Sequence, residues 1–475
     1  MSKKDAKEGV GKSKLSALEK LRSEYDDKRK LAVIERCKPF TLSDAQLNQV
    51  CGSMMRALKD GLRQSRRDRS SVKCYPTYVR TLPTGKERGN FLALDLGGTN
   101  FRVLHVEIGP DGQLKQDSKI YAVPASVMTG RGESLFSHLV DCIEHFAKER
   151  GLRGVPLGFT FSFPCRQEGL ARGRLVRWTK GFACEGVEGR DVGGMLQEAL
   201  DRRPGIDVEV KAVINDTTGT LVSKAWDRRN ASVGVIVGTG FNVCYVEKAS
   251  RVGGMEGEAG RTKEGRAEEG TMVVNTEMGA FGEKGELEGV RTEFDRVVDA
   301  ASIHPGEHVL EKLVSGMYLG ELVRVVLLGL REEGLVFEGR RCLQLREKGS
   351  VPTKYVSEIE SDGPHHRVMA REILEEVGVS EPTVHDCATV RYVCRAVSRR
   401  AAHLAAAAVA AVARRVERSP VVAAVDGSLF RHHPHFARIM QEKTQQLLGP
   451  GTEVELCLSE DGSGRGAALV AASVR

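Results

Sequence analysis

LALDLGGTNFRV, at Leu92–Val103, passes from an apolar run that ends in Asp95 directly into the turn Gly97–Asn100. Glycines allow backbone N–H groups to approach phosphate oxygens closely, and the Thr99 and Asn100 side chains can also donate hydrogen bonds. The same residue types are expected in an ordinary hairpin turn. Taken alone, the stretch fits a phosphate-binding turn and a plain hairpin equally well.

Two further turns of small residues favour the phosphate interpretation. Gly238-Thr239-Gly240 separates two apolar, strand-like runs, and Asp426-Gly427-Ser428 follows the run VVAAV. Three such turns at strand ends could converge on one triphosphate.

The rest of the chain alternates strand-like and helix-like patterns. Apolar, β-branched runs recur at FLALD, VPLGFTFSF, VGVIV and PVVAAV, and residues 134–148 show the 3.6-residue period of an amphipathic helix. This pattern predicts an α/β protein. The length of 475 residues and two strand, Gly-turn, strand units suggest two related lobes.

Composition narrows the range of partners. The net charge of +7, from 71 basic and 64 acidic residues, is diluted over a large surface and suits small anionic ligands. Aromatic residues make up only 5%, and no basic tract is interleaved with them, so we expect no nucleic-acid partner.

Cysteine usage and apolar runs predict a chain of the reducing cytosol without a membrane partner. The eleven cysteines form no compact framework, and MSKKDAKEGVGKSK contains no apolar core of a signal peptide. The longest apolar run, residues 401–413, is too short to cross a membrane and is predicted to be a buried helix.

Several segments are predicted to carry no chemistry. Residues 1 to about 40 are rich in charge and should lie outside the core. AKEGVGKS, at residues 6–13, resembles a phosphate-binding loop but follows no buried strand, so we dismiss it. Residues 249–270 are expected to form a surface loop.

A catalytic base is suggested by KAVINDTTGT, residues 211–220, where a strand delivers Asn215 and Asp216 to a helix start. An acid in this position can act as a general base or can simply cap the helix. WTKGF, residues 178–182, offers Thr179 and Lys180 as partners for a phosphoryl group, although a lone lysine is usually a solvated charge.

Eleven motifs in a fixed order together resemble the hexokinase family, over nearly the whole chain from about Ser71 onward. They are LALDLGGTNFRV, LGFTFSFPCRQ, WTKGF, EGRDV, NDTTGT, IVGTG, VNTEMGAFG, EKLVSGMYLGELVR, TKYVSEIESD, VDGSLF and SEDGSGRGAAL.

The resemblance implies an actin-like, ribonuclease-H-like fold with two lobes and a deep interdomain cleft. Residues 1–70 would form a preamble, partly disordered and then helical. The small domain would span residues 71–214, joined by a C-terminal helix at 462–475, and the large domain would span residues 215–461.

The resemblance also implies ATP-dependent phosphorylation of the 6-hydroxyl of glucose and related hexoses, the entry step of glycolysis. Asp216 would accept the hydroxyl proton and Lys180 would stabilise the charge that develops. Carboxylates and amides suit sugar hydroxyls because those groups both donate and accept. The implied sugar-binding residues are Ser162, Phe163, Thr179, Lys180, Asn215, Asp216, Asn242, Glu277 and Glu311.

ATP and Mg²⁺ are the implied cosubstrate and cofactor. ATP oxygens and water would hold Mg²⁺, with Asp95 nearby and no direct protein ligand. The implied ATP-binding residues are Asp95, Leu96, Gly97, Gly98, Thr99, Asn100, Thr239, Gly240, Gly316, Met317, Thr353, Ser357, Gly427 and Ser428.

Three features depart from the family pattern: the bulky Phe241 after the Gly-Thr-Gly turn, Met278 after Glu277, and a long Gly-rich loop before Thr271. Phe241 could alter the fit of the nucleotide. Two alternatives stay open: a catalytically weak sugar sensor or regulatory hexose-binding protein, and a kinase for another sugar such as a hexosamine. We expect a monomer that acts on glucose, with mannose and fructose as further candidates.

Overall fold

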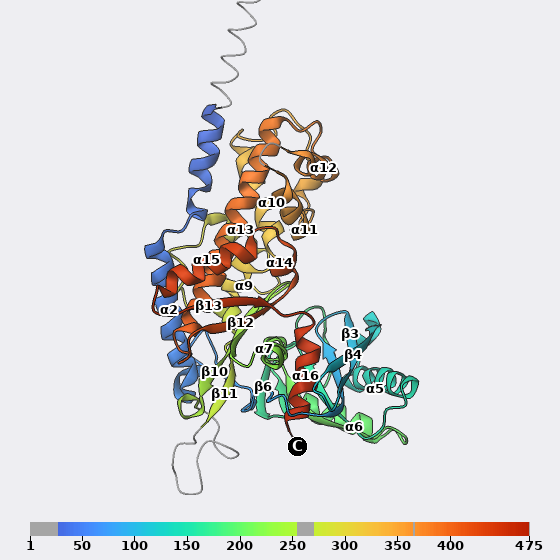
Figure 1. Cartoon of the computed structure of the whole chain (residues 1–475). Helices are drawn as coiled ribbons and strands as arrows, with labels where there is room; N and C mark the ends of the chain where they lie inside the picture. Colours follow the sequence, from blue (N-terminus) through green and yellow to red (C-terminus); the bar gives the residue numbers. More distant parts are fainter. Residues whose placement is uncertain (1–26, 254–269, 364–365, 475) are drawn as a thin grey trace, which may run out of the picture.

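The computed structural model describes residues 27–253, 270–363 and 366–474, which form two lobes built around separate sheets (Figure 1). The α/β class and the two-lobed arrangement predicted from the sequence are confirmed. Residues 6–13 and most of the predicted surface loop at 249–270 lie outside the described residues.

The first lobe contains a five-stranded sheet in the order β4-β3-β2-β5-β8. LALDLGGTNFRV forms a hairpin, since β2 and β3 are antiparallel and Leu96 pairs with Phe101. Strand β5 runs parallel to β2, and β8 runs parallel to β5. The carboxyl ends of these three strands therefore lie at one edge of the sheet. The strands are β2 (Gly89–Leu96), β3 (Asn100–Ile108), β4 (Leu114–Ala122), β5 (Val155–Phe161) and β8 (Val208–Ile214).

Alternate residues of β2 serve two different cores, as expected for a strand buried on both faces. Leu92 and Leu94 pack with residues of α5 (Gly132–Glu149) and α6 (Val192–Asp201). Phe91 and Ala93 face the opposite way, toward a core that both sheets share.

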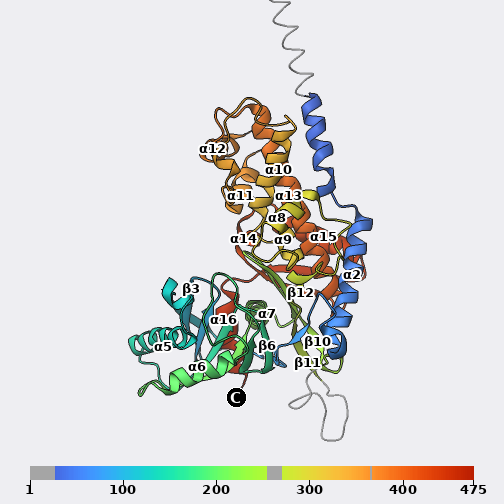
Figure 2. The same cartoon turned by 180° about the vertical axis from the view of Figure 1, so that it is seen from behind.

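Two helices fill the space between the sheets, as Figure 2 shows from behind: α7 (Asp216–Asp227) and the C-terminal α16 (Gly462–Ser473). Their backbones meet closely, because a Cβ on Gly466 would lie 2.0 Å from the Gly219 carbonyl oxygen. Only glycine permits this approach. The end of the chain therefore packs against the start of α7, where the candidate base lies.

The second lobe contains a six-stranded sheet in the order β1-β11-β10-β9-β12-β13. Strands β9 and β10 form a hairpin around Gly238–Gly240, and β12 runs parallel to both of its neighbours. The strands are β1 (Tyr75–Pro76), β9 (Ala231–Val237), β10 (Phe241–Lys248), β11 (Thr271–Asn275), β12 (Val421–Asp426) and β13 (Val454–Leu458).

Helices surround the long α13 (Val384–Ala413), whose alanine-rich residues 401–413 are buried, which confirms the predicted buried helix. Within the described ranges, no helix combines the length and apolarity that a membrane crossing requires. The neighbouring helices are α2 (Asp44–Leu62), α9 (Val309–Val314), α10 (Leu319–Glu332), α11 (Thr353–Ser361) and α15 (Phe436–Leu448).

The remaining elements are short connections. They are α3 (Gln64–Arg67), α4 (Ala125–Met128), β6 (Cys165–Gly169), β7 (Arg172–Leu175), α8 (Glu293–Ala300), α12 (Val368–Glu376), α14 (Ser428–His432) and the 3₁₀ turns Lys38–Phe40, Ala249–Arg251, Met278–Ala280 and Gln344–Arg346.

The expectation that residues up to about 40 lie outside the core was wrong for the described part. Val33, Cys37 and Phe40 are buried in the same core as α13. Phe40 packs against the Phe294 ring and the guanidinium of Arg400 on α13, so a few apolar residues of this segment join the core. Strand β1 also pairs with β11, so residues 75–76 join the six-stranded sheet although they fall in the segment assigned to the small domain. The other domain boundaries remain predictions.

Candidate active site

Asn215 and Asp216 stand at the carboxyl end of β8, where α7 begins. Asn215 caps the helix, since its Oδ1 accepts hydrogen bonds from Thr218 N at 3.2 Å and Thr218 Oγ1 at 2.5 Å. Asp216 is the first helical residue, and its Oδ1 accepts from Thr217 N at 2.8 Å. Asn215 therefore fills the N-cap position, and Asp216 uses one carboxylate oxygen, Oδ1, for a hydrogen bond to the helix backbone.

The surroundings of Asp216 suit a proton acceptor. Burial raises the pKa of its carboxyl group, while Lys180 and the Thr217 N–H oppose the rise and the nearby Asp95 and Asp426 add to it. A raised pKa brings a carboxylate closer to the range in which a general base is effective.

Lys180 lies on the loop after β7, in a left-handed backbone conformation with φ of +56°. Its Nζ donates to the Ser162 carbonyl oxygen at 2.8 Å and lies 5.5 Å from the centre of the Phe163 ring. Ser162 follows β5 directly, and its N–H donates to the Leu96 carbonyl at 3.1 Å. These contacts join the loop to the phosphate-binding candidate turn after β2.

An aromatic cluster packs around this loop. The rings of Phe163, Trp178 and Phe182 contact one another with centroid separations of 5.0–5.4 Å. Phe163 is buried within the cluster, whereas Thr179 is half-buried. Any contact of Phe163 with a sugar would therefore come from its backbone.

Asn242, Asn275 and Glu277 form a chain of hydrogen bonds in the second lobe. Asn242 Nδ2 donates to Asn275 Oδ1 at 2.9 Å, and Asn275 Nδ2 donates to Glu277 Oε1 at 2.8 Å. Glu277 has a left-handed backbone with φ of +53°. Such strain in a residue other than glycine is often found at functional sites.

The environment of Glu277 penalises its negative charge. Burial raises the pKa of Glu277 to about 7; Asn275 opposes the rise, and the nearby carboxylates of Asp216 and Glu311 add to it. The carboxyl group therefore titrates near neutral pH.

Glu311, on α9, is held against the Gly-Thr-Gly hairpin. Its Oε2 accepts from Phe241 N at 2.9 Å, and burial raises its pKa. A Cβ on Gly240 would lie 2.8 Å from the same oxygen, so a residue with a side chain could not sit there without displacing the carboxylate.

The Gly-Thr-Gly turn contacts Gly427, as the sequence suggested, and also Gly316, whereas its convergence with the turn at Gly97–Asn100 stays a prediction. Gly316 N donates to the Gly238 carbonyl at 2.7 Å, and Met317 N donates to the Thr239 carbonyl at 3.2 Å. Gly427 has φ of +120°, and a Cβ there would lie 2.3 Å from the Val237 carbonyl oxygen. Three backbone segments rich in N–H groups thus lie together.

The remaining nucleotide candidates occupy the rim of this region. Thr353 Oγ1, at the start of α11, accepts from Gly320 N at 2.9 Å, and Ser357 lies one turn further on. Met317 is exposed. In the hairpin after β2, Leu96 is buried, Gly97 lies beside Ser162, Gly98 faces open space and Thr99 and Asn100 complete the turn.

Asp95 is tied to the start of α16. Its Oδ2 accepts from Ser463 Oγ at 2.6 Å and Arg102 Nη2 at 3.0 Å. Arg102 also contacts Asp461, and Gly462 N donates to Asp426 Oδ2 at 3.2 Å. The C-terminal helix therefore positions two acids of the site.

Phe241 is 2% exposed and packs in the core of the second lobe. Its effect on nucleotide fit stays a prediction. The β10 alternation turns Phe241 inward and Asn242 outward. Met278 is fully buried, and its N–H donates to Asn242 Oδ1 at 3.1 Å.

Asn275 was not singled out by the sequence analysis, nor were Ser463 and Arg102. Asn275 is largely buried and joins Asn242 to Glu277. In the sequence, Asn275 could have been found from its position in VNTEMG, two residues before the candidate sugar-binding residue Glu277. Only the antiparallel register of β10 and β11 reveals the contact.

The resemblance implies that Mg²⁺ has no direct protein ligand, and this stays a prediction. Across residues 27–253, 270–363 and 366–474, no group of three His, Cys, Asp or Glu side chains could hold a metal ion. Asp95 can contact the hydrated ion from outside its inner shell of ligands. Its Oδ2 already accepts hydrogen bonds from Arg102 and Ser463.

This fold and this arrangement of acids, amides and glycine turns define a two-lobed sugar kinase. Two family models, both described as Hexokinase, match residues 32–226 and 232–473. The chain belongs to the hexokinase family.

Individual relatives agree with this assignment. A hexokinase of Schistosoma mansoni is 44% identical over 93% of this chain and 96% of its own length. Human Hexokinase-2 is 46% identical over 91% of this chain, which spans 47% of that protein. Hexokinase-3 of Homo sapiens is similar at 45% identity, and the chain spans 46% of it.

Solved structures give the same result. The structure of the Schistosoma mansoni hexokinase complexed with glucose matches with a TM-score of 0.87 and 43% identity, over 94% of this chain and 99% of that one. A second hexokinase crystal structure matches with a TM-score of 0.81 and 29% identity, over 94% of this chain and all of the other.

Proposed function

We propose that this chain transfers the γ-phosphoryl group of ATP to the 6-hydroxyl of glucose and related hexoses. The observation that carries the proposal is that Asp216 and Lys180 lie close enough to Glu277 and Glu311 to shift their pKa values: Asp216 raises both, and Lys180 lowers both. The similarity to a hexokinase complexed with glucose supports a hexose as the substrate.

In the proposed reaction, Asp216 accepts the proton of the 6-hydroxyl as its oxygen attacks the γ-phosphorus. Lys180, anchored to the Ser162 carbonyl, stabilises the charge on the transferring group. The capping bonds of Asn215 keep the α7 N-terminus fixed, so the base is held before substrate arrives.

Recognition of the sugar ring falls to the remaining polar groups. Asn242, Glu277 and Glu311 come from the second lobe, while Ser162 and Thr179 come from the first. Each buried acid or amide needs a partner, so an epimer that leaves one unpaired would bind less well. This favours glucose-type hexoses over a hexosamine.

ATP is proposed to lie along the glycine turns, with its phosphates near Gly238–Gly240 and Gly427 and its nucleoside toward Thr353 and Ser357. The close approach of Gly427 to the Val237 carbonyl and of Gly316 to the Gly238 carbonyl supports this placement, because glycines let a phosphate come near the backbone. When bound with ATP, Mg²⁺ would neutralise charge on the phosphate oxygens, with Asp95 close by.

We further propose a monomer that acts in the cytosol, with a hexose and ATP as its partners and without a nucleic-acid or membrane partner. All eleven cysteines are free thiols, as a reducing compartment requires. Light scattering on the purified protein tests the monomeric state, and cell fractionation tests the cytosolic location.

A coupled assay for ADP formation tests the proposed function. Glucose, mannose, fructose and glucosamine are supplied separately with Mg²⁺ and ATP. We expect turnover with glucose at a rate typical of kinases, on the order of 1–100 per second. Glucose binding without ADP formation would support the sensor alternative instead, and preferential turnover of glucosamine would support a hexosamine kinase.

A further inference from the structure

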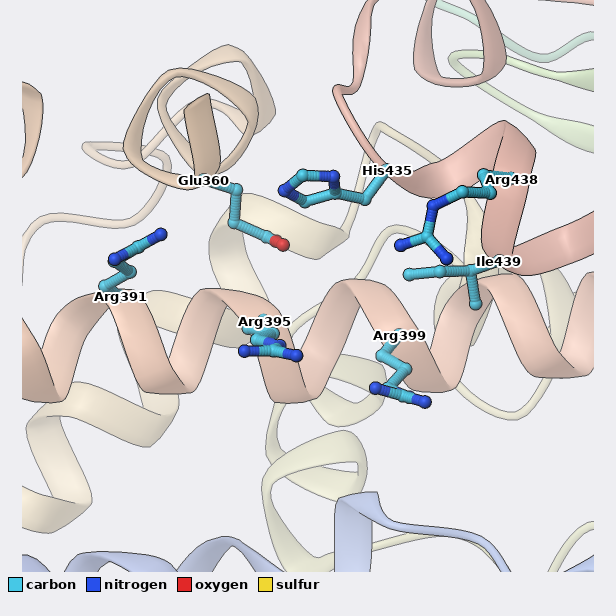
Figure 3. A pocket seen from close by; sticks show the side chains of 7 residues that line it. All are labelled: Glu360, Arg391, Arg395, Arg399, His435, Arg438 and Ile439. Carbon is cyan, nitrogen blue, oxygen red and sulfur yellow. The ribbon is translucent and has the colours of Figure 1, made fainter. Parts of the chain in front are cut away.

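A groove rich in arginine lies in the second lobe, away from Asp216, between α11, α13 and the start of α15 (Figure 3). Arg391, Arg395 and Arg399 line it from α13, at a spacing of four residues that places them on one side of the helix. His435 and Arg438 line the opposite wall.

The arginines of this groove differ in what they contact. Arg391 has a structural role, because its guanidinium donates to the carbonyls of Asp362 at 2.6 Å and Gly363 at 3.1 Å. Arg395 and Arg399 are exposed, and within the described residues neither guanidinium has a hydrogen bond or an ion pair. Two cationic forks are therefore available at the mouth of the groove.

Little negative charge offsets these cations. Among the described residues that line the groove, Glu360 is the one acid, and its Oε1 already accepts from Ser398 Oγ at 2.5 Å and is 3.1 Å from His433 Nε2. Arg438 pairs with Glu442, but both side chains are exposed, and such pairs contribute little. The groove therefore keeps a positive potential.

This arrangement is unfavourable for the protein alone. Like charges four residues apart on a helix repel one another, and Arg395 and Arg399 have no compensating acid among the described residues. A guanidinium fork matches phosphate oxygens in two-point hydrogen bonds. The two side chains start about 6 Å apart along the helix axis, a spacing that adjacent phosphate groups can bridge.

We propose that this groove is a second anion site, which binds a small phosphate-bearing metabolite through Arg395 and Arg399, with Arg438 and His435 on the facing wall. Ile439 supplies an apolar patch beside these groups for the uncharged part of the ligand. The site is separate from the cleft, since no residue that lines it belongs to the candidate sugar or phosphate sets.

Titration calorimetry at low ionic strength tests the proposal, with sodium pyrophosphate as the probe. The variant R395Q/R399Q should bind pyrophosphate at the groove about tenfold or more weakly than the unmodified protein. The control R63Q/R153Q removes the same charge from exposed positions elsewhere and should keep the affinity. The R395Q/R399Q variant should also retain the rate of ADP formation, because its residues lie outside the cleft.

Equal pyrophosphate affinity in the two double variants would overturn the proposal. Binding of vesicles that contain phosphatidic acid, or of single-stranded RNA, in preference to pyrophosphate would overturn the small-molecule assignment. Pyrophosphate binding is measured without hexose or ATP, so its outcome is independent of whether the protein phosphorylates a hexose. Thermal melting of both variants checks that they fold.

Discussion

Arg177 Nη2 donates to His308 Nε2 at 2.9 Å, and the same guanidinium pairs with the Glu307 carboxylate. Arg177 immediately precedes the loop that carries Thr179 and Lys180, and His308 immediately precedes α9, which carries Glu311. Burial and the neighbouring guanidinium lower the pKa of His308 to about 4, so its ring is neutral and can accept this bond. The contact links the two halves of the candidate sugar site.

Arg177→Gln should therefore weaken glucose binding, because the link favours the arrangement in which both lobes reach the sugar. We expect the dissociation constant for glucose to rise about fivefold, equivalent to about 1 kcal/mol. Intrinsic fluorescence titration measures it. The control Arg174→Gln removes a comparable pair, with Glu168, that lies wholly within the first lobe. Identical affinities in the two variants would contradict the role of the link.

Asn275→Ala should raise the KM for glucose about tenfold, since it leaves Asn242 Nδ2 and Glu277 Oε1 without their partners. It should also raise the pKa of Glu277 further, because the Asn275 hydrogen bond lowers it. Steady-state kinetics across pH measures both effects. The control Asn90→Ala removes an exposed contact with His105. A KM that is no higher than in this control would count against Asn275 as a positioning residue.

The pKa of Glu277 is about 7 in the folded protein, against an ordinary value of 4.5. Its contribution to the free energy of unfolding should therefore fall as the pH rises from about 4.5 to about 7. In this window the folded state holds a proton that the unfolded state has released, so unfolding becomes easier with rising pH. Glu277→Gln removes this titration. Its gain in melting temperature over the unmodified protein should be larger at pH 8 than at pH 5.

Melting curves at both pH values, with the exposed Glu372→Gln as control, measure this difference. A gain of the same size at pH 5 and pH 8 would show that Glu277 keeps an ordinary pKa in the folded protein.

The parts of the fold that local patterns control were predictable. The hairpin after Asp95, the buried helix at 401–413 and the strand that leads to Asp216 all follow from runs of a single periodicity. The contact of Gly427 with Gly238 could be inferred because both glycines stand at strand ends.

What the sequence could not predict depends on contacts between distant segments. Ser463 reaches Asp95 only because α16 returns between the sheets, and Val33 is buried in a core that residues far along the chain form. The inward orientation of Phe241 likewise depends on the register of β10 against β9. No local pattern near these residues encodes such partners.

The central claim is that Asp216 is the base of hexose phosphorylation, and Asp216→Ala tests it most directly. Asn215 still caps α7 in this variant, so the fold should persist. The measurement compares turnover in the ADP assay with glucose affinity by calorimetry, and Asp111→Ala serves as an exposed control. We expect turnover to fall about a hundredfold to ten-thousandfold while glucose still binds, though more weakly. Unchanged turnover in purified Asp216→Ala would contradict the account.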